Sequence, residues 1–219
     1  MVTSHKEPCM SLPSKTSLFA AAKRWDAALV AQLLAQAPQW AQAVDGKGRT
    51  ALQVACGVSA QNAQSADTNG LETVATLLAA GAVLEAEAPM GECNGDFCAT
   101  ALWFAVARGE NLPLVELLLS HGANASYSLW AAVWRDDEAM CRALLQAQPL
   151  LNLREHGETP VFYAARLGRL KTLELLLDAG ADVSVADFKG RDAVDIALSR
   201  RLPQGLIYRM QQLRQPRLA

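Results

Sequence analysis

The segment GETPVFYAARLGRLKTLELLLDAGADV, residues 157–183, has the pattern of two short helices joined by a turn. In its second half four leucines recur at intervals of three and four residues, which places them on one face of an α-helix. They are Leu170, Leu173, Leu176 and Leu177. Gly180 follows where a helix often ends in a left-handed residue. Neither helix can bury its apolar face alone, so the segment predicts a unit that stacks against similar units.

The helix start of this unit, TPVFYAA at residues 159–165, recurs along the chain. Related segments begin at Thr16, Thr50, Thr100, Tyr127 and Asp192. Most of them are followed by a second apolar run, such as VAQLLAQA, VATLLAAGA or VELLLSHGA. Several copies in register indicate a repeat protein far more strongly than a single match would.

This pattern resembles the ankyrin repeat, in which a Thr-Pro-Leu-His-x-Ala-Ala helix start is followed by a turn, a leucine-rich helix and a terminal Gly-Ala. The resemblance covers residues 16–213 and implies an all-α ankyrin-repeat solenoid of about six helix-turn-helix repeats joined by β-hairpin fingers. Outside it we expect a flexible leader at residues 1–15 and a tail at 214–219. The resemblance also implies binding of another protein through a concave face built from finger tips and inner helices.

The repeats start near residues 16, 50, 100, 127, 159 and 192, so their spacing departs twice from the expected step of about 33. The long second step contains a polar insertion at 57–70, which predicts an exposed loop between the helices of repeat two. It also contains an insertion at 85–99, which lengthens the finger between repeats two and three. The short third step nearly removes the next finger. Drift in a tolerant scaffold and a groove shaped for a partner both explain these changes.

In the long finger, Asn94-Gly95 predicts a tight hairpin that places residue 91 opposite residue 98. Cys93 and Cys98 would then not face each other, so no disulfide is implied. The chain has five cysteines, an odd number at irregular spacing, which fits reduced thiols. With no apolar leader and no apolar run long enough for a bilayer, we expect a cytoplasmic protein that does not bind membranes.

The two positions after each Ala-Ala pair carry a cation in most repeats. The six pairs are Lys23-Arg24, Gly57-Val58, Ala107-Arg108, Trp134-Arg135, Arg166-Leu167 and Ser199-Arg200. The resemblance implies that these positions are exposed on the concave face, although the chain as a whole has a net charge of −2. We therefore expect an electropositive groove that attracts an acidic protein partner, with acids such as Glu116, Glu174 and Asp178 kept to the outer helices. Alternatively, Asp136, Asp137 and Glu138 neutralise the neighbouring arginines.

Aromatic residues gather in repeats three to five. Trp103, Trp130 and Phe162 occupy the position where the family usually has histidine, and we expect them to pack between repeats. Trp134 should instead be exposed beside Arg135, which makes it a candidate anchor for a partner docking across repeats three to five. The complete set of predicted protein-binding residues is Arg24, Arg108, Tyr127, Trp134, Arg135, Arg166 and, in the long finger, Phe97.

Motifs for catalysis are missing from the sequence. The three histidines, His5, His121 and His156, have no metal-ligand spacing, and we expect the last two at the surface. No Gly-Lys-Ser phosphate loop and no nucleophile elbow occurs. We therefore expect no enzyme activity, no cofactor, no metal and no small-molecule substrate. The net charge of −2 also disfavours nucleic-acid binding.

The sequence thus predicts a protein–protein interaction module. A compact, stand-alone ankyrin-repeat chain is similar to bacterial immunity proteins, which implies that it neutralises or regulates one cognate toxin, effector or enzyme. The irregular spacing favours one dedicated partner. The alternative is an adaptor that links several proteins more weakly.

Overall fold

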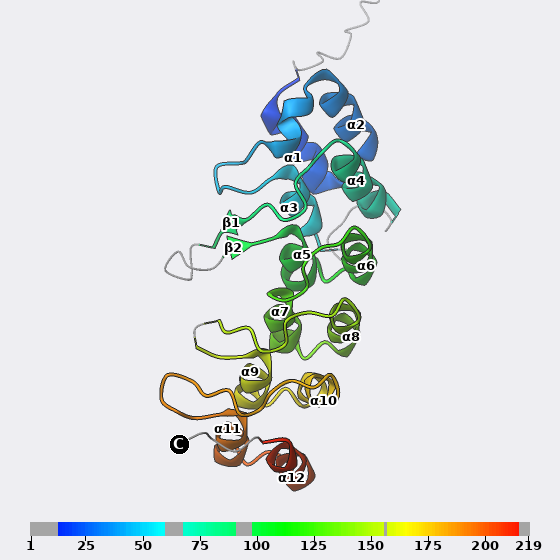
Figure 1. Ribbon diagram of the computed structural model, residues 1–219. Helices are drawn as coiled ribbons and strands as arrows, with labels where there is room; N and C mark the ends of the chain where they lie inside the picture. The colour runs from blue at the N-terminus through cyan, green and yellow to red at the C-terminus, as the bar shows by residue number, and fades with distance from the viewer. Residues whose placement is uncertain (1–12, 60–67, 91–97, 156, 215–219) are drawn as a thin grey trace, which may run out of the picture.

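The computed structural model describes residues 13–59, 68–90, 98–155 and 157–214. Within these ranges the chain forms an all-α stack of helix pairs, with inner helices in one column and outer helices in a second column (Figure 1). The inner helices are α1 (Lys15–Arg24), α3 (Ala51–Cys56), α5 (Ala101–Phe104), α7 (Ser128–Arg135), α9 (Pro160–Leu167) and α11 (Ala193–Ser199). The outer helices are α2 (Ala27–Gln36), α4 (Thr68–Ala79), α6 (Leu112–Ser120), α8 (Glu138–Gln146), α10 (Leu170–Asp178) and α12 (Gln204–Leu213).

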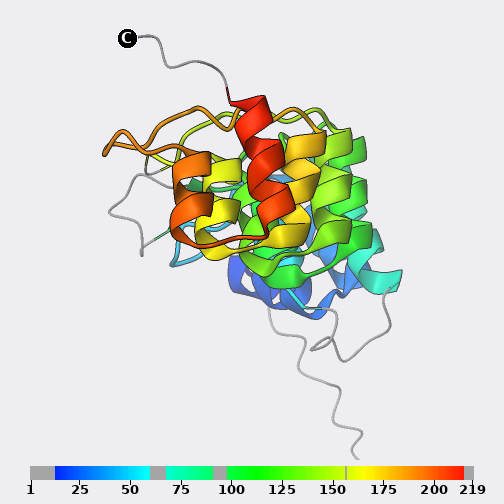
Figure 2. The ribbon, with the colours of Figure 1, turned by 90° about the horizontal axis from the view of Figure 1, so that it is seen from below.

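Each helix contacts its partner in the pair and its counterpart in the next repeat, as a solenoid requires. Viewed along the stack, the helices of successive repeats lie nearly over one another (Figure 2). The connecting segments, including the fingers, project to the side opposite the outer helices (Figure 1). This arrangement confirms the predicted all-α solenoid of about six repeats.

Local sequence explains where the helices begin and end. Most inner helices begin with a side-chain cap, as where Thr159 accepts a hydrogen bond from the N–H of Phe162 at 3.3 Å; α7 is an exception. They commonly end at a left-handed residue directly before the next cap, such as Gly168 with φ of 66°. The predicted leucine face of α10 is confirmed, because Leu173 and Leu176 are fully buried.

The first inner helix lies close to the expected repeat start near residue 16, since α1 begins at Lys15 and the Ser14 hydroxyl caps it by accepting from the N–H of Ser17 at 3.1 Å. One predicted boundary needs correction. The loop of repeat two is shorter than 57–70, since α4 already starts at residue 68 and buries Gly70 against the ring of Trp25.

The long finger between repeats two and three is a hairpin of β1 (Ala88–Pro89) and β2 (Cys98–Ala99). Its register differs from the prediction, because Cys98 lies opposite Pro89 and not opposite residue 91. Pairing is set at the root of the finger, where Ala88 and Ala99 are fully buried, so the hairpin cannot slide without moving both out of the core. The Asn94-Gly95 turn itself lies outside the described residues.

The shortened connection between repeats three and four is confirmed. Residues 121–127, between α6 and α7, form turns without a strand or a bridge. At the same place Glu85 Oε1 accepts a hydrogen bond from the N–H of Asn124 at 2.9 Å, which ties this connection to the base of the long finger. The inner face is therefore uneven beside repeat three.

Candidate protein-binding surface

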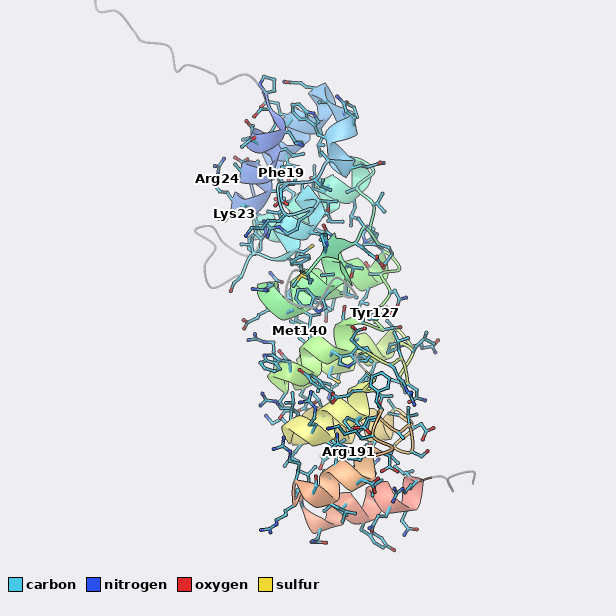
Figure 3. All side chains as sticks on the ribbon, turned by 90° about the vertical axis from the view of Figure 1, so that its left-hand side faces the viewer. Phe19, Lys23, Arg24, Tyr127, Met140 and Arg191 are labelled. Atoms are coloured by element: carbon cyan, nitrogen blue, oxygen red, sulfur yellow. The ribbon has the colours of Figure 1, made fainter. Side chains whose placement is uncertain are left out.

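The predicted contact residues that the structure describes lie at or near the ends of the inner helices, except Tyr127, which directly precedes α7. Lys23 and Arg24 end α1, as Figure 3 shows, and Trp134 and Arg135 end α7. Trp134 has 57% of its surface exposed and Tyr127 has 42%, which confirms the expected exposure of Trp134. Phe97 lies outside the described residues, so its predicted contact role stays a prediction.

The aromatic residues at the family histidine position behave as expected. Phe162 is fully buried, Trp103 is half-buried against the core, and Trp130 is half-buried. Tyr127 stacks on Trp130 with ring centroids 6.1 Å apart, so its exposed ring is already supported from one side. Trp134 thus presents the larger exposed aromatic surface of this part of the inner face.

Arginines of repeats four and five are paired with carboxylates. Arg135 forms an ion pair with Glu110, the left-handed residue of the preceding repeat. Arg166 lies 2.8 Å from Glu158, and its guanidinium lies 5.0 Å from the centroid of the Tyr163 ring. These pairs neutralise much of the positive charge that the sequence predicts in repeats four and five.

The acids that neutralise them are not the predicted ones. The Asp136 carboxylate instead accepts two hydrogen bonds, one from the N–H and one from the hydroxyl of Thr172, each at 3.0 Å. Asp137 caps α8, and Glu138 pairs with Arg142 at 2.8 Å. The left-handed conformation of Asp136, with φ of 52°, turns the chain away from the inner face, so these carboxylates serve the outer helices.

The predicted cations of repeats one and three have no such partners among the described residues. Lys23, Arg24 and Arg108 are exposed, and none forms an ion pair with another described residue. Lys47, which sequence reasoning missed, joins them from the tip of the finger between repeats one and two. Arg200 of repeat six is likewise exposed and forms no ion pair with another described residue. Within the predicted column, the paired cations are therefore those of repeats four and five, and the described cations without a partner are most numerous in repeats one to three.

Arg108 reaches its position through an irregular turn. From Thr100 to the next cap, Asn111, repeat three has one residue more than repeat five has from Thr159 to Arg169. The structure absorbs this residue in a π-helical turn, Ala105–Gly109, a feature frequent at functional sites. The signal was present in the sequence as a one-residue change in the spacing between the two caps.

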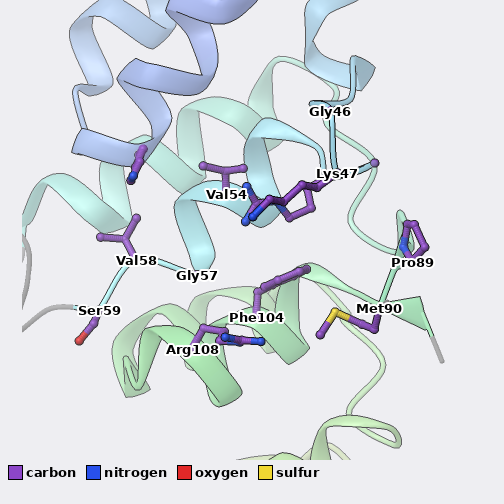
Figure 4. A pocket seen from close by; sticks show the side chains of 13 residues that line it. Gly46, Lys47, Val54, Gly57, Val58, Ser59, Pro89, Met90, Phe104 and Arg108 are labelled. Atoms are coloured by element: carbon purple, nitrogen blue, oxygen red, sulfur yellow. The ribbon is translucent and has the colours of Figure 1, made fainter. Parts of the chain in front are cut away.

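A cavity of about 1090 Å³ lies between repeats one and three, and we call it the basic pocket. Its walls come from the end of α1, the finger turn 46–49, α3 and residues 57–59, the base of the long finger, and the α5 segment (Figure 4). Lys47 extends from the finger side, whereas Phe104 and Arg108 lie on the helix below (Figure 4). Its basic side chains are Lys23, Lys47, Arg49 and Arg108, and none of the described residues that line it is acidic.

The walls of the basic pocket are held by specific contacts. Asp45 accepts from the N–H groups of Lys47 and Arg49 at 2.8 and 2.9 Å and pairs with the Arg49 guanidinium at 2.7 Å. Burial alone would raise the pKa of Asp45, but the hydrogen bonds and the charge of Arg49 lower it below 3.8. The buried Gln53 amide donates to the carbonyl oxygens of Ala86 and Ala99, one on each side of the long finger.

Glycines allow the walls to approach closely. A Cβ on Gly48, which has φ of 74°, would lie 2.9 Å from the Pro89 ring, so glycine lets the two fingers meet. A Cβ on Gly109 would lie 2.4 Å from the carbonyl oxygen of Cys56, so the π-helical turn packs directly on the end of α3. The basic pocket is therefore largely pre-formed.

Among the described residues, no group of three or more His, Cys, Asp or Glu side chains could hold a metal ion. His121 is exposed at the end of α6, as expected, and His156 lies outside the described part of the chain. Burial raises the pKa of the Cys56 and Cys141 thiols, that of Cys141 to about 12. Within the described ranges, no helix is both long and apolar enough to cross a bilayer.

Comparison with known proteins agrees with this architecture. A family model for ankyrin repeats in three copies matches residues 61–187. No similar sequence was found among curated proteins. Among solved structures, the ankyrin-repeat protein EF0377 is 20% identical with a TM-score of 0.66, and the alignment covers 91% of this chain and 96% of that one.

Two further solved structures are similar over nearly their whole length. An ankyrin-repeat domain from Acinetobacter baumannii AYE is 24% identical with a TM-score of 0.68, covering 91% of this chain and 96% of that one. The complex of the predatory endopeptidase Bd0816 from Bdellovibrio bacteriovorus with the immunity protein Bd3460 contains a chain that is 26% identical. Its TM-score is 0.64, and the alignment covers 90% of this chain and 97% of that one.

Proposed function

We propose, from the premise that this chain belongs to the ankyrin-repeat family, that it binds one specific acidic-surfaced protein through its inner face and neutralises or regulates that protein. Ankyrin repeats are protein–protein interaction modules, so the general class follows from the family. The choice of an acidic partner is carried by one observation. Lys23, Arg24 and Arg108 are exposed and have no carboxylate partner among the described residues, in a chain of net charge −2.

Trp134 supports the same face. Its exposed ring lies beside Arg135 at the end of α7, and the connection that leads into α7 is shortened. Exposed tryptophans next to arginines are common energetic centres of protein interfaces. A partner that contacts both α7 and the N-terminal cations would span the inner face along the stack.

The neutralising role is favoured by a solved relative and by the irregular repeats. One similar structure is the complex of a predatory endopeptidase with an immunity protein. The lengthened and shortened fingers beside repeat three give this chain an individual shape, which suits one dedicated partner better than many. An adaptor role is the alternative, and it predicts several weaker partners. Family membership favours a non-enzymatic scaffold, and nothing in the described surface points to substrate, cofactor or nucleic acid.

Affinity capture from a lysate of the source organism tests the proposal. The purified chain should retain one acidic protein stoichiometrically, identified by mass spectrometry, and should inhibit or alter its activity when the two are mixed. Truncation of the anchor by Trp134→Ala should weaken binding of that partner by about 2 kcal/mol or more. The charge reversal Lys171→Glu on the outer helix α10 should leave binding unchanged.

The outcomes separate the alternatives. A partner whose activity is unaffected, or many partners held weakly, would support the adaptor over the inhibitor. Retention of the partner by Trp134→Ala with unchanged affinity would remove α7 from the interface. Hydrolysis of a substrate by the purified chain alone would contradict the binding-module proposal.

A further inference from the structure

We propose that the basic pocket is the recognition site for a short acidic segment of the partner, one that inserts an apolar side chain between two or more carboxylates. This inference rests on the proposed function and adds to it a location and a chemical class of ligand. It also differs from the sequence-based expectation, which placed the docking centre across repeats three to five.

Charge is the first argument. Lys23, Lys47 and Arg108 reach the pocket from three different repeats or fingers, and no described carboxylate pairs with any of them. Cations gathered from separate elements repel one another, so the arrangement costs stability unless a ligand compensates it. In repeats four and five, by contrast, the chain supplies its own acids, Glu110 to Arg135 and Glu158 to Arg166. The pocket is where carboxylates from another molecule would fit.

Shape and apolar lining are the second argument. Apolar side chains line the pocket among the cations: Phe104, Val54 and Met90, together with Pro89 from the long finger. A free carboxylate or phosphate gains nothing from contact with these apolar side chains, whereas a leucine or phenylalanine side chain would be stabilised by burying its apolar surface against them. The volume of about 1090 Å³ lies at or above the upper end of small-molecule sites, about 300–1,000 Å³, which suits a peptide segment.

Pre-organisation is the third argument. The Asp45 turn fixes the backbone around Lys47, and the Gln53 amide fixes the base of the finger that carries Pro89 and Met90. The π-helical turn presents Arg108, and Gly109 lets that turn pack on α3. A site whose walls are already ordered loses less conformational entropy when a ligand binds.

The charge pattern favours an acidic peptide over nucleic acid. A nucleic-acid backbone needs a continuous basic track, because its phosphates repeat at short regular intervals. Here the track stops after repeat three, since Arg135 and Arg166 are both neutralised by glutamates. A short acidic segment needs only the local cluster.

The test is a titration of the isotope-labelled full chain with an acetylated, amidated peptide, Asp-Glu-Phe-Asp-Glu, followed by NMR. We expect the amide signals of Gly46, Gly48 and Gly57 to shift, because these residues line the pocket. The peptide Asn-Gln-Phe-Asn-Gln, which lacks charge, and Asp-Glu-Gly-Asp-Glu, which lacks the ring, should each bind about tenfold more weakly or worse.

Matched variants localise the effect. Lys47→Glu should weaken peptide binding about tenfold or more, whereas Lys189→Glu, at the same place in the equivalent turn of the last finger, should change it less than about twofold. Arg108→Glu should behave like Lys47→Glu, and Lys171→Glu on α10 like the control. Lys47 and Arg108 are both exposed, so these two variants should fold. An NMR spectrum that is unchanged outside the pocket would verify this.

Several results would overturn the inference. The amide signals would fail to shift at peptide concentrations up to about 5 mM, or only signals of repeats four and five would shift. The uncharged peptide would bind as tightly as the acidic one, or a ten-nucleotide oligothymidine would bind at the pocket more tightly than the acidic peptide. The proposed function fails separately, if the wild-type chain captures no partner. If Lys47→Glu captures the partner as well as wild type does, the pocket assignment fails while the interaction module stands.

Discussion

Replacing Asp136 with alanine should destabilise the protein by about 2–3 kcal/mol, because this one side chain connects repeats four and five. Its carboxylate accepts from the N–H and the hydroxyl of Thr172, each at 3.0 Å. Thr172 is fully buried in the first turn of α10, and Arg169, the residue before that helix, provides no side-chain cap. No other described side chain accepts from that N–H.

The magnitude follows from the geometry. A buried N–H left without an acceptor costs about 1–3 kcal/mol, and a hydrogen bond to a charged group contributes about 1.5–3 kcal/mol. The two figures describe the same bond and are not added. The Thr172 hydroxyl loses less hydrogen-bond energy in the variant, because it lies 3.3 Å from the carbonyl oxygen of Arg169 and can donate to that oxygen instead. Alanine also tolerates the left-handed conformation of residue 136 less well than aspartate does.

Urea unfolding followed by circular dichroism measures this loss, and thermal unfolding should show a midpoint lower by about 4–12 °C. Asp136→Asn keeps an acceptor oxygen and should lose about 1 kcal/mol or less. Asp137→Ala removes the ordinary cap of α8 and should cost about 1 kcal/mol. If Asp136→Ala cost no more than Asp137→Ala, the carboxylate would not be coupling the two repeats, and the reasoning would be refuted.

Three further predictions concern the walls and the core. Gly109→Ala should lower stability by about 1–3 kcal/mol, because its Cβ would meet the Cys56 carbonyl oxygen at 2.4 Å, and an unchanged thermal midpoint would contradict that close approach. Cys56 and Cys141 should resist iodoacetamide at pH 8 until urea unfolds the chain, since burial raises the pKa of both thiols, and mass spectrometry of digests would show early labelling if this is wrong. The pKa of Asp45 lies below 3.8 in the folded state, so the ionised carboxylate stabilises the fold above pH 3.8, and this stabilisation is lost as the pH falls through the folded pKa. The variant Arg49→Met should return the pKa of Asp45, measured by NMR, toward 3.8.

Sequence reasoning succeeded where structure is decided within one repeat. The leucine spacing predicted the buried face of α10, and Gly180 predicted a helix end that has φ of 85°. The position of Trp134 after the Ala-Ala pair predicted its exposure. Each of these features depends on residues a few positions apart, which helical periodicity and cap chemistry relate directly.

It failed where neighbouring repeats meet. Arg135 pairs with Glu110, which lies in the preceding repeat, and not with the acids that follow it in sequence. Which carboxylate reaches which guanidinium depends on the rotation between repeats, and no single-repeat pattern encodes that rotation. The strand register of the long finger also depends on residues far away in the sequence. Gln53 in α3 donates hydrogen bonds to the carbonyl oxygens of Ala86 and Ala99, one on each side of the hairpin root.

The one-residue insertion in repeat three explains why the two halves of the inner face differ. Without it, Gly109 would occupy the left-handed position that ends the inner helix, as Gly168 does in repeat five. The π-helical turn moves Glu110 there instead, although a non-glycine residue is less favourable in that conformation. From that position Glu110 pairs with Arg135, while Arg108 is left at the basic pocket without a described acid. The added residue thus gives the arginine of repeat four a carboxylate partner and leaves the arginine of repeat three open to the carboxylates of a partner.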